Sequence, residues 1–274
     1  MGILHLVATP IGNLEDISAR ALRTLREARL IAAEDTRHTR QLLTHFDIHT
    51  PLTSYYEHNK LSKLDAILTA LSGGDVALVS DAGMPAINDP GYELVKAALA
   101  AGHTVSPVPG PSAPIAALAA SGLPTESFLY LGYLPRKGGE RRALLQGVAG
   151  LPYTLILLET PHRLLEALDD LLSVLGEREM AAARELTKLH EQIVRGTVAE
   201  LQAHFTANEP RGEFTLVVGG RTTGGDERWS EEQILTEIST GLAAGKSASE
   251  LASELARLSA WPRREIYTLI NQHK

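Results

Sequence analysis

The sequence predicts an α/β protein with two successive α/β domains and a small helical unit at its C-terminal end. Apolar runs alternate with segments of helical periodicity in a regular βαβα order. This alternation restarts after residue 121, and a glycine-rich stretch at 219–226 precedes a tail with helical periodicity alone. We therefore predict an N-terminal parallel α/β domain over residues 1–121, a second α/β domain over residues 122–222 and a helical unit over residues 228–274.

The first domain contains segments with the apolar character of strands in a buried parallel sheet. These segments are His5–Ala8, Leu30–Ala33, Leu52–Tyr55, Val76–Ser80 and Thr104–Val108. Helical periodicity occupies the intervals at Ile17–Ala28, Arg37–Phe46, Leu61–Leu71, Tyr92–Ala101 and Ala113–Ala120. Gly102 directly follows the fourth helix, a position where glycine commonly ends helices.

In the second domain the predicted strands are Phe128–Leu131, Thr154–Leu158, Met180–Arg184 and Phe214–Val218. Amphipathic helices such as Leu164–Leu175 separate them, and the hinge between the domains is expected near Gly122–Thr125. In the tail, Lys246–Ala252 and Trp261–Tyr267 predict a helix-turn-helix unit.

Composition limits the possible functions. The chain has 274 residues, of which 44% are hydrophobic, enough to bury a core in each of about two domains. It has no cysteine, which excludes disulfides and cysteine-ligated zinc. There is no basic signal region and no run of about eighteen apolar residues, so we expect a cytoplasmic protein without a membrane partner. The net charge of -7 disfavours a surface coated in nucleic acid but permits local basic patches.

Common nucleotide-binding and hydrolase motifs are not supported. Gly241–Ser247 resembles a phosphate-binding loop, but it is one residue short and no strand precedes it. Gly110–Pro114 lacks the second glycine of a nucleophile elbow. No Gly-x-Gly-x-x-Gly follows the first strand, so an ordinary dinucleotide site is not expected.

Loops rich in proline, glycine and charge follow the predicted strands. Asp81 follows the strand Val76–Ser80, and Gly83 and Pro85 then give the chain a turn-rich path. Similar loops occur at residues 8–17, 33–40, 107–113, 158–163 and 184–191. Because the carboxyl ends of parallel strands meet at one edge of a sheet, we expect a ligand crevice there, shared with the second domain. For each loop alone, a structural βα connection is the alternative.

The motifs at residues 8–14, 33–37, 80–85, 89–91, 109–111, 161–163 and 184–188 closely resemble those of the ribosomal RNA small subunit methyltransferase I family. That family belongs to the tetrapyrrole methylase superfamily, and the resemblance covers essentially the whole chain. It implies S-adenosylmethionine held in a cleft between two α/β domains of a homodimer. It also implies 2′-O-methylation of a cytidine in the decoding region of 16S rRNA, within a small ribosomal subunit. Met84 stands where the family pattern leads us to expect threonine.

The resemblance also implies where the cofactor binds. The implied binding residues are Pro10, Asp81, Met84, Ser112, Ala113, Leu158, Leu186 and Thr215. Methyl transfer is an in-line displacement that requires positioning and exclusion of water, so we expect neither a metal site nor a covalent intermediate.

A ribose hydroxyl is a poor nucleophile, so a nearby general base would assist the transfer. The candidates are Glu34, Asp35, Glu159 and Glu185, with Asp35 preferred. The alternative role for Asp35 is an N-cap on the helix that follows it.

RNA recognition is expected from local charge and aromatic rings. The candidate contacts are Arg37, Arg40 and Tyr55 in the first domain, Arg136 and Lys137 in a basic loop, and Arg263 and Arg264 in the tail. The alternatives are an ordinary strand tyrosine, a solvated surface turn and a tail that packs on the body of the protein. Two other functions remain open: a tetrapyrrole-precursor or diphthine-type methyltransferase, and a helix-turn-helix nucleic-acid-binding regulator.

Overall fold

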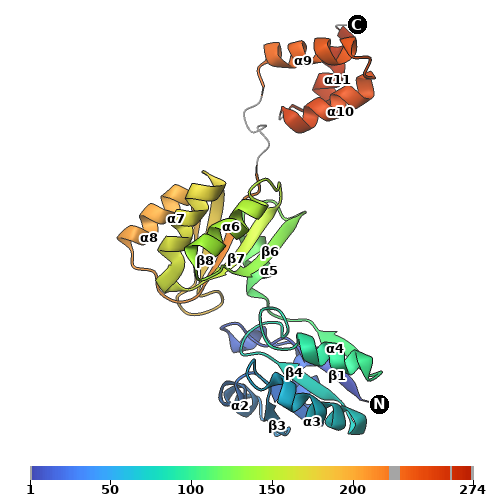
Figure 1. The fold of residues 1–274 in the computed structure, drawn as a ribbon, viewed down its shortest axis with the longest axis vertical. Helices are drawn as coiled ribbons and strands as arrows, with labels where there is room; N and C mark the ends of the chain where they lie inside the picture. Colours follow the sequence, from blue (N-terminus) through green and yellow to red (C-terminus); the bar gives the residue numbers. More distant parts are fainter. Residues whose placement is uncertain (1, 222–228, 260, 273–274) are drawn as a thin grey trace.

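The computed structural model describes residues 2–221, 229–259 and 261–272. Two α/β domains follow one another along the molecule, and a group of three helices lies beyond the second (Figure 1). The predicted fold class is confirmed.

The first sheet is entirely parallel, as predicted. Its strands are β1 (Ile3–Val7), β2 (Leu30–Ala33), β3 (Leu52–Ser54), β4 (Val76–Val79) and β5 (Thr104–Val108), in the order β3-β2-β4-β1-β5. Its helical elements are η1 (Leu14–Asp16), α1 (Ala19–Glu27), α2 (Thr36–His45), α3 (Lys60–Gly73) and α4 (Tyr92–Ala100). Every residue of β4 is buried, because helices cover both faces of the sheet.

Alternation along β4 divides the core of this domain into two layers. Ala77 and Val79 pack in the cluster that includes residues of α1 and α2, whereas Val76 and Leu78 pack in the cluster that includes residues of α3 and α4. Strands β1 and β4 are neighbours whose following helices lie on opposite faces of the sheet. In such sheets the ligand crevice lies beyond the carboxyl ends of these two strands.

The second sheet is mixed. It contains β6 (Phe128–Tyr133), β7 (Thr154–Glu159), β8 (Glu179–Arg184), β9 (Gln192–Thr197) and β10 (Phe214–Val218), in the order β6-β7-β10-β8-β9. Only β6 and β7 run parallel among these paired strands. The sequence did not predict β9, because this edge strand carries Gln192, Arg195 and Gly196 and has no continuous apolar run.

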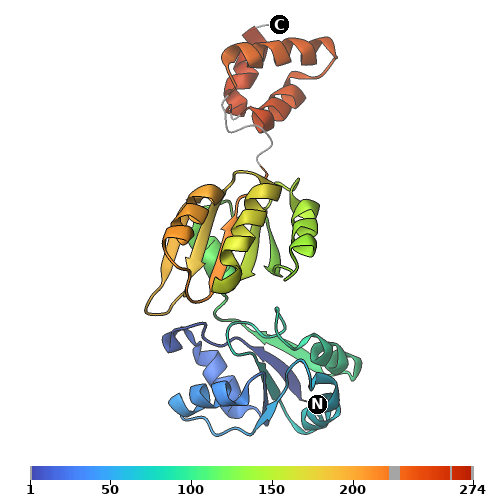
Figure 2. The ribbon, with the colours of Figure 1, turned by 60° about the vertical axis from the view of Figure 1, so that its left-hand side comes forward.

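Helices cover both faces of the second sheet. On one face α6 (Gly138–Val148), α7 (Leu164–Leu175) and α8 (Val198–Ala207) build the largest apolar cluster, visible as a layer of helices in Figure 2, and η2 (Pro161–Arg163) directly precedes α7. On the other face lies α5 (Ala113–Ser121), whose Ala117 and Leu118 pack against Ile156 and Val217. The predicted boundary at residues 121 and 122 groups α5 with the first domain, yet its apolar contacts are with the second sheet.

The C-terminal helices have a core of their own. Helices α9 (Glu231–Ala243), α10 (Ala248–Leu258) and α11 (Arg263–Gln272) bury Ile234, Leu251 and Ile266 against one another. Side chains cap α9 and α10 at Ser230 and Ser247 in reciprocal capping boxes. Of the predicted linker at 219–226, residues 222–226 lie outside the described residues. Within the described ranges, no helix has the length and apolar character needed to cross a membrane.

Candidate functional site

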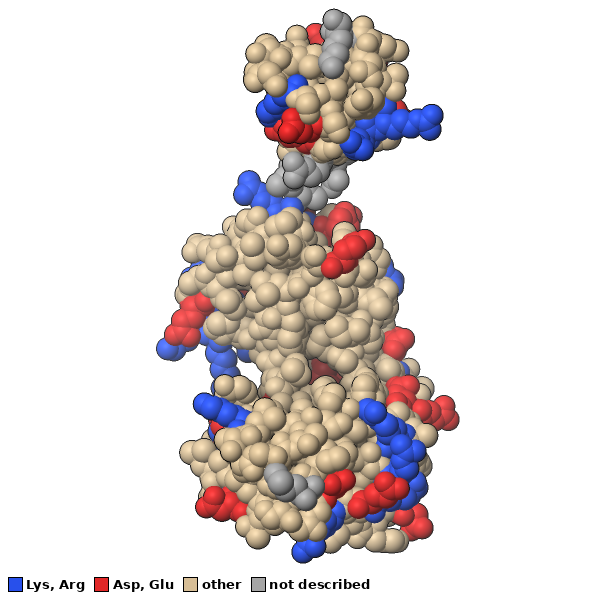
Figure 3. All heavy atoms as spheres, turned by 90° about the vertical axis from the view of Figure 1, so that its right-hand side faces the viewer, with Lys and Arg blue, Asp and Glu red and all other residues tan. Residues whose placement is uncertain are grey.

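A cavity of about 690 Å³ lies between the two α/β domains. The space-filling view shows the hollow between them (Figure 3). From the first domain it is lined by loops at the carboxyl ends of the parallel strands, and from the second by the face of the sheet that also carries α5. Its position is therefore the one predicted from the strand-end loops.

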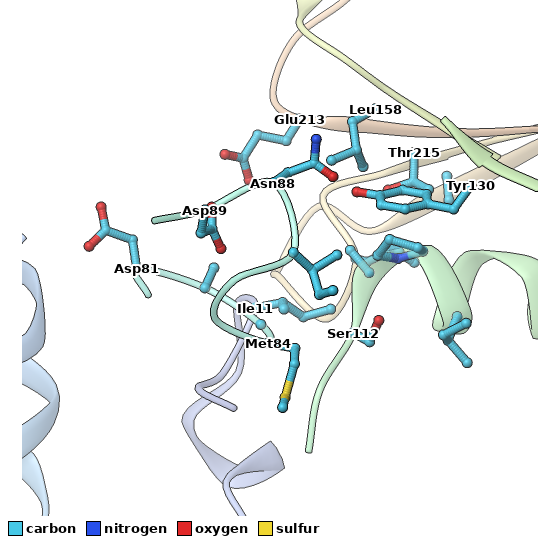
Figure 4. A pocket seen from close by; sticks show the side chains of 18 of the residues that line it. Ile11, Asp81, Met84, Asn88, Asp89, Ser112, Tyr130, Leu158, Glu213 and Thr215 are labelled. Atoms are coloured by element: carbon cyan, nitrogen blue, oxygen red, sulfur yellow. The ribbon is translucent and has the colours of Figure 1, made fainter. Parts of the chain in front are cut away.

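The loop after β4 forms one wall of the cavity through a tightly turned backbone. Gly83, Ala86 and Asn88 have φ values of 78°, 69° and 64°, in the left-handed region. Gly83 also exchanges two backbone hydrogen bonds with Thr9, of 2.9 and 3.0 Å, which tie this loop to the loop after β1. These turns direct Asp81, Met84, Asn88 and Asp89 along the wall (Figure 4).

Glycine permits the two domains to approach each other closely at two points. A Cβ atom on Gly12 would lie 2.4 Å from Cγ of Lys188, and one on Gly132 would lie 2.3 Å from Nδ2 of Asn88. A side chain at either position would push the walls of the cavity apart.

The structure brings most of the predicted cofactor residues together. Those that line the cavity are Asp81, Met84, Ser112, Ala113, Leu158, Leu186 and Thr215. Pro10 instead lines a neighbouring cavity of about 250 Å³, which Asp81 also borders. Ser112 is the N-cap of α5, but its side chain makes no capping hydrogen bond. The α5 N-terminus thus faces the cavity with backbone donors that no side chain caps.

Carboxylates gather at the end of the cavity formed by the first domain. Burial and the charge of Asp89 raise the pKa of Glu34, and burial also raises the pKa of Asp89. The backbone N–H of Asp81 faces Oε2 of Glu34 at 3.4 Å. Figure 4 shows Asp81 and Asp89 on one side of the cavity, with Ser112 and Tyr130 on the other. Among the described residues, no group of three or more such side chains is arranged to hold a metal ion.

Asp35, the preferred base candidate, does not line the cavity. Its Oδ1 accepts a 2.8 Å hydrogen bond from the backbone N–H of Arg37, and its Oδ2 pairs with Nη2 of Arg37 at 2.7 Å. The side-chain hydrogen bond from Arg37 holds the pKa of Asp35 well below its usual range. The structure thus gives Asp35 the alternative role, an N-cap on α2.

Glu159 is also directed away from the cavity. It alternates with Leu158 along β7, so its buried side chain lies on the opposite face, where Arg163 pairs with it at 3.0 Å. Burial raises the pKa of Glu159.

Glu185 does line the cavity, and its Oε1 accepts hydrogen bonds from Nζ of Lys188 at 2.9 Å and from the N–H of Glu213 at 3.0 Å. Burial favours the neutral carboxyl, but these hydrogen bonds outweigh it and lower the pKa of Glu185.

The predicted RNA contacts divide into exposed and buried groups. Arg37, Arg40, Arg136, Lys137 and Arg264 are exposed. Tyr55 is fully buried in the core beside α3, so the expectation that its ring stacks on a base is wrong. Its neighbour Tyr56 is 41% exposed instead. Both residues follow the end of β3 at Ser54, and only Tyr55 is still tied to the sheet, through a 2.7 Å hydrogen bond from its N–H to the carbonyl of Ala33.

Part of the basic run at residues 136–142 lies in α6 and forms ion pairs with α7. Arg141 and Arg142 both pair with Asp170 of α7, at 2.5 and 3.1 Å, but only Arg141 is buried, whereas the side chain of Arg142 is about half exposed. In the tail, the guanidinium of Arg263 donates to the hydroxyls of Ser253 and Ser249 at 2.9 and 3.0 Å.

The sequence analysis missed three aromatic residues of the site. Phe128, Tyr130 and Tyr133 of β6 all line the cavity. The sequence feature that could have revealed them is Gly132. A glycine inside a strand often marks a bulge, and a bulge changes the direction of later side chains.

Comparison with known proteins identifies the family. Residues 3–202 match the model of the Tetrapyrrole (Corrin/Porphyrin) Methylases. The chain belongs to this family. A relative from Synechocystis sp., named Ribosomal RNA small subunit methyltransferase I, is 50% identical over 271 residues, or 98% of this chain and 97% of the relative. The resemblance seen in the motifs is therefore confirmed, and this tetrapyrrole methylase family member is a methyltransferase.

Two further relatives carry the same name. The one from Halalkalibacterium halodurans is 54% identical over 80% of this chain and 76% of its own length. The one from Thermotoga maritima is 49% identical over its entire length, which covers 81% of this chain.

Solved structures share the fold at lower identity. Diphthine synthase has a TM-score of 0.60 at 14% identity and covers 81% of this chain and 91% of its own. A uroporphyrin-III C-methyltransferase from Thermus thermophilus, complexed with S-adenosylhomocysteine, has a TM-score of 0.55 at 21% identity and covers 80% of this chain and 97% of its own.

Proposed function

We propose that this methyltransferase transfers a methyl group from S-adenosylmethionine to the ribose 2′-oxygen of a cytidine in the decoding region of 16S rRNA. The single observation that carries the proposal is the interdomain cavity, which is lined by the same loops whose motifs match the ribosomal RNA small subunit methyltransferase I proteins. Those relatives share one name at about half identity, which disfavours a tetrapyrrole or diphthine substrate and a purely regulatory role.

The cavity suits the cofactor in size and chemistry. Its volume of about 690 Å³ is typical of small-molecule sites. The α5 N-terminus offers free backbone N–H groups to an anionic ligand group such as a carboxylate, and Thr215 and Ser112 add hydroxyls. Asp81 and its acidic neighbours favour a cationic ligand group. When bound, S-adenosylmethionine supplies an electrophilic methyl group on a positively charged sulfur.

Glu34 is the carboxylate best placed to accept the proton of the ribose hydroxyl. It lines the cavity, and its raised pKa lies closer to neutrality than that of an ordinary glutamate. The walls contributed by both domains hold the acceptor oxygen in line with the methyl group and exclude water.

The test is methyl transfer to defined RNA. Purified protein, labelled S-adenosylmethionine and small ribosomal subunits should yield a 2′-O-methylated cytidine in the decoding region, detected by mapping resistance to alkaline cleavage. Naked 16S rRNA in a parallel reaction identifies the substrate form. Absence of label in both RNA substrates, or label on a base rather than a ribose, would overturn the proposal.

We also propose that the enzyme is a homodimer that works in the cytoplasm, where its rRNA substrate is found. Tyr92 and Leu99 expose 67% and 57% of their surface on α4, which supplies apolar surface for a partner. Sedimentation equilibrium tests this part, and a monomer at micromolar concentration would contradict it.

A further inference from the structure

Strand β6 has a bulge that changes which side chains face the cavity. In a regular strand, Tyr130 and Tyr133 would point to opposite faces of the sheet. In the register of β6 with β7, however, Tyr130 pairs with Ile156 and Gly132 pairs with Leu157, so that one extra residue lies between them. Gly132 has a φ of 65°, which glycine tolerates.

The bulge aligns three aromatic side chains on one face. Phe128, Tyr130 and Tyr133 pair with Thr154, Ile156 and Leu158, which are alternate residues of β7, and all three aromatic residues line the cavity. We call these three residues the β6 aromatic row. Phe128 and Tyr133 are 42% and 48% exposed, although large aromatic side chains usually bury more of their surface.

The two ends of this row differ in their surroundings. Tyr130 lines the cavity together with the proposed cofactor residues Leu158 and Thr215, and burial raises its pKa to about 12. Tyr133 shares the cavity wall with Asp89, Lys188 and Glu213, and burial and the charges of Glu213 and Asp89 raise its pKa. Glu213 in turn pairs with Nζ of Lys188 at 3.0 Å. An aromatic face beside a carboxylate and an ammonium group offers both stacking and hydrogen bonds to the edge of a base.

We propose that the β6 aromatic row is the stacking surface for the unpaired target nucleobase, with Tyr133 as its main contact. This inference rests on the proposed RNA substrate and names the part of the cavity that receives it. Proteins that bind single-stranded RNA stack splayed bases on tyrosine and phenylalanine rings. The acidic surroundings of Tyr133 disfavour a phosphate at this position and favour a base.

The test compares three variants with the wild type. Tyr133→Ala removes the ring, Tyr133→Phe keeps the ring and removes the hydroxyl, and Tyr153→Ala is the matched control. Tyr153 is 43% exposed but does not line the cavity. The ligand is a 16S rRNA fragment that carries a fluorescent cytidine analogue at the methylated position, because stacking on tyrosine quenches such a probe.

We expect Tyr133→Ala to lose the quenching and to weaken RNA affinity by about 5- to 160-fold, the range that corresponds to loss of one stacked base. Tyr133→Phe should retain quenching, and Tyr153→Ala should bind RNA as the wild type does. Affinity for S-adenosylmethionine should stay unchanged in Tyr133→Ala, which also shows that this variant is folded.

Wild-type quenching and RNA affinity in Tyr133→Ala would overturn the stacking role while leaving the proposed function intact. Failure of the wild type to methylate any 16S rRNA substrate would instead overturn the proposed function itself. Loss of quenching in Tyr133→Phe would also contradict the inference, since it would assign the effect to the hydroxyl rather than to the ring.

Discussion

Two neighbouring acidic residues in the loop after β2, Glu34 and Asp35, have different structural roles. Asp35 caps α2 and pairs with Arg37, whereas Glu34 lines the cavity beside Asp89. Both carry a carboxyl group after the same strand, and the sequence favoured Asp35. The direction of each side chain depends on where the strand ends and the helix begins, which boundaries from sequence rarely define to one residue.

The first prediction separates these two carboxylates. Glu34→Gln should lower kcat by about 10²- to 10⁴-fold, the usual contribution of a general base. Asp35→Asn is the matched control, because asparagine is an equally good N-cap and only an exposed ion pair is lost. Single-turnover methylation of 16S rRNA measures both. Equal rates in Glu34→Gln and the wild type would remove the base role from Glu34.

The second prediction concerns pH and stability. Burial raises the folded pKa of Glu34 above the ordinary glutamate value of 4.5, so the folded state binds more protons than the unfolded state between these two pKa values. Stability from this group is complete below 4.5 and is lost as the pH rises through the folded pKa. Glu34→Gln removes this titration, so its free energy of unfolding should rise relative to wild type between about pH 4 and pH 7. Urea unfolding at several pH values measures the difference, and a constant difference contradicts it.

The third prediction concerns the proposed cofactor wall. Ser112→Trp places an indole in the cavity, and no side-chain cap of α5 is lost because Ser112 makes none. We expect affinity for S-adenosylmethionine to fall about tenfold or more, since overpacking of a filled site costs about 1–3 kcal/mol. Ser112→Ala removes only the hydroxyl and leaves the cavity open, so it separates loss of that contact from steric exclusion, and calorimetric titration measures both. Equal affinity in Ser112→Trp and wild type would place the cofactor elsewhere.

At the scale of elements, basic residues that the sequence placed in an open loop form ion pairs between two helices. The run from Arg136 to Arg142 is basic, yet its second half lies in α6 and faces α7. Arg141 and Asp170 expose only 5% and 9% of their side chains and join Nε to Oδ2 at 2.5 Å. Without Asp170, the buried Arg141 would keep only Glu166 at 3.5 Å, and without Arg141, Asp170 would keep only Arg142 at 3.1 Å.

The fourth prediction follows from this pair. Arg141→Ala should lower the free energy of unfolding, but by less than the roughly 3–5 kcal/mol that follows loss of the sole partner of a buried charge, because Asp170 keeps its pair with Arg142. Arg136→Ala should change stability little, because Arg136 is exposed. Thermal and urea unfolding measure both changes. RNA affinity should show the reverse order, and a loss of RNA affinity in Arg141→Ala without loss of stability would contradict the structural assignment.

At the scale of the whole molecule, the two α/β domains build the site and the C-terminal helices stand apart from it. Residues 229–272 carry six acidic and four basic residues, so the tail as a whole is not basic. The acidic residues are Glu231, Glu232, Glu237, Glu250, Glu254 and Glu265, and the basic ones are Lys246, Arg257, Arg263 and Arg264. The Thermotoga maritima relative matches over its entire length while covering 81% of this chain. Any RNA contact by the tail must therefore come from a local group such as Arg263 and Arg264.

The fifth prediction tests the role of the tail. A chain ending at Arg221, whose N–H donates to the carbonyl of Leu151 at 2.7 Å, should bind S-adenosylmethionine as the full chain does and RNA more weakly. In the full chain, Arg264→Ala should reduce the salt dependence of RNA affinity by a slope of about 0.7–0.9 for one lost phosphate contact. Arg263→Ala should also disturb the packing of α11 on α10, because its guanidinium binds Ser249 and Ser253. An unchanged slope in Arg264→Ala would refute phosphate contact at this position.

The sequence alone determined the parallel sheet, the position of the cavity and the family. Continuous apolar runs such as Val76–Val79 are local signals, and the carboxyl ends of parallel strands always share an edge, so Asp81 could be placed without coordinates. Only the tertiary structure decided which side chains enter the cavity. Tyr55 is buried, Asp35 caps a helix and α5 packs on the second sheet because their directions depend on contacts between distant segments. Tyr133 faces the cavity because of the backbone bulge at Gly132, whose register is defined only by pairing with β7.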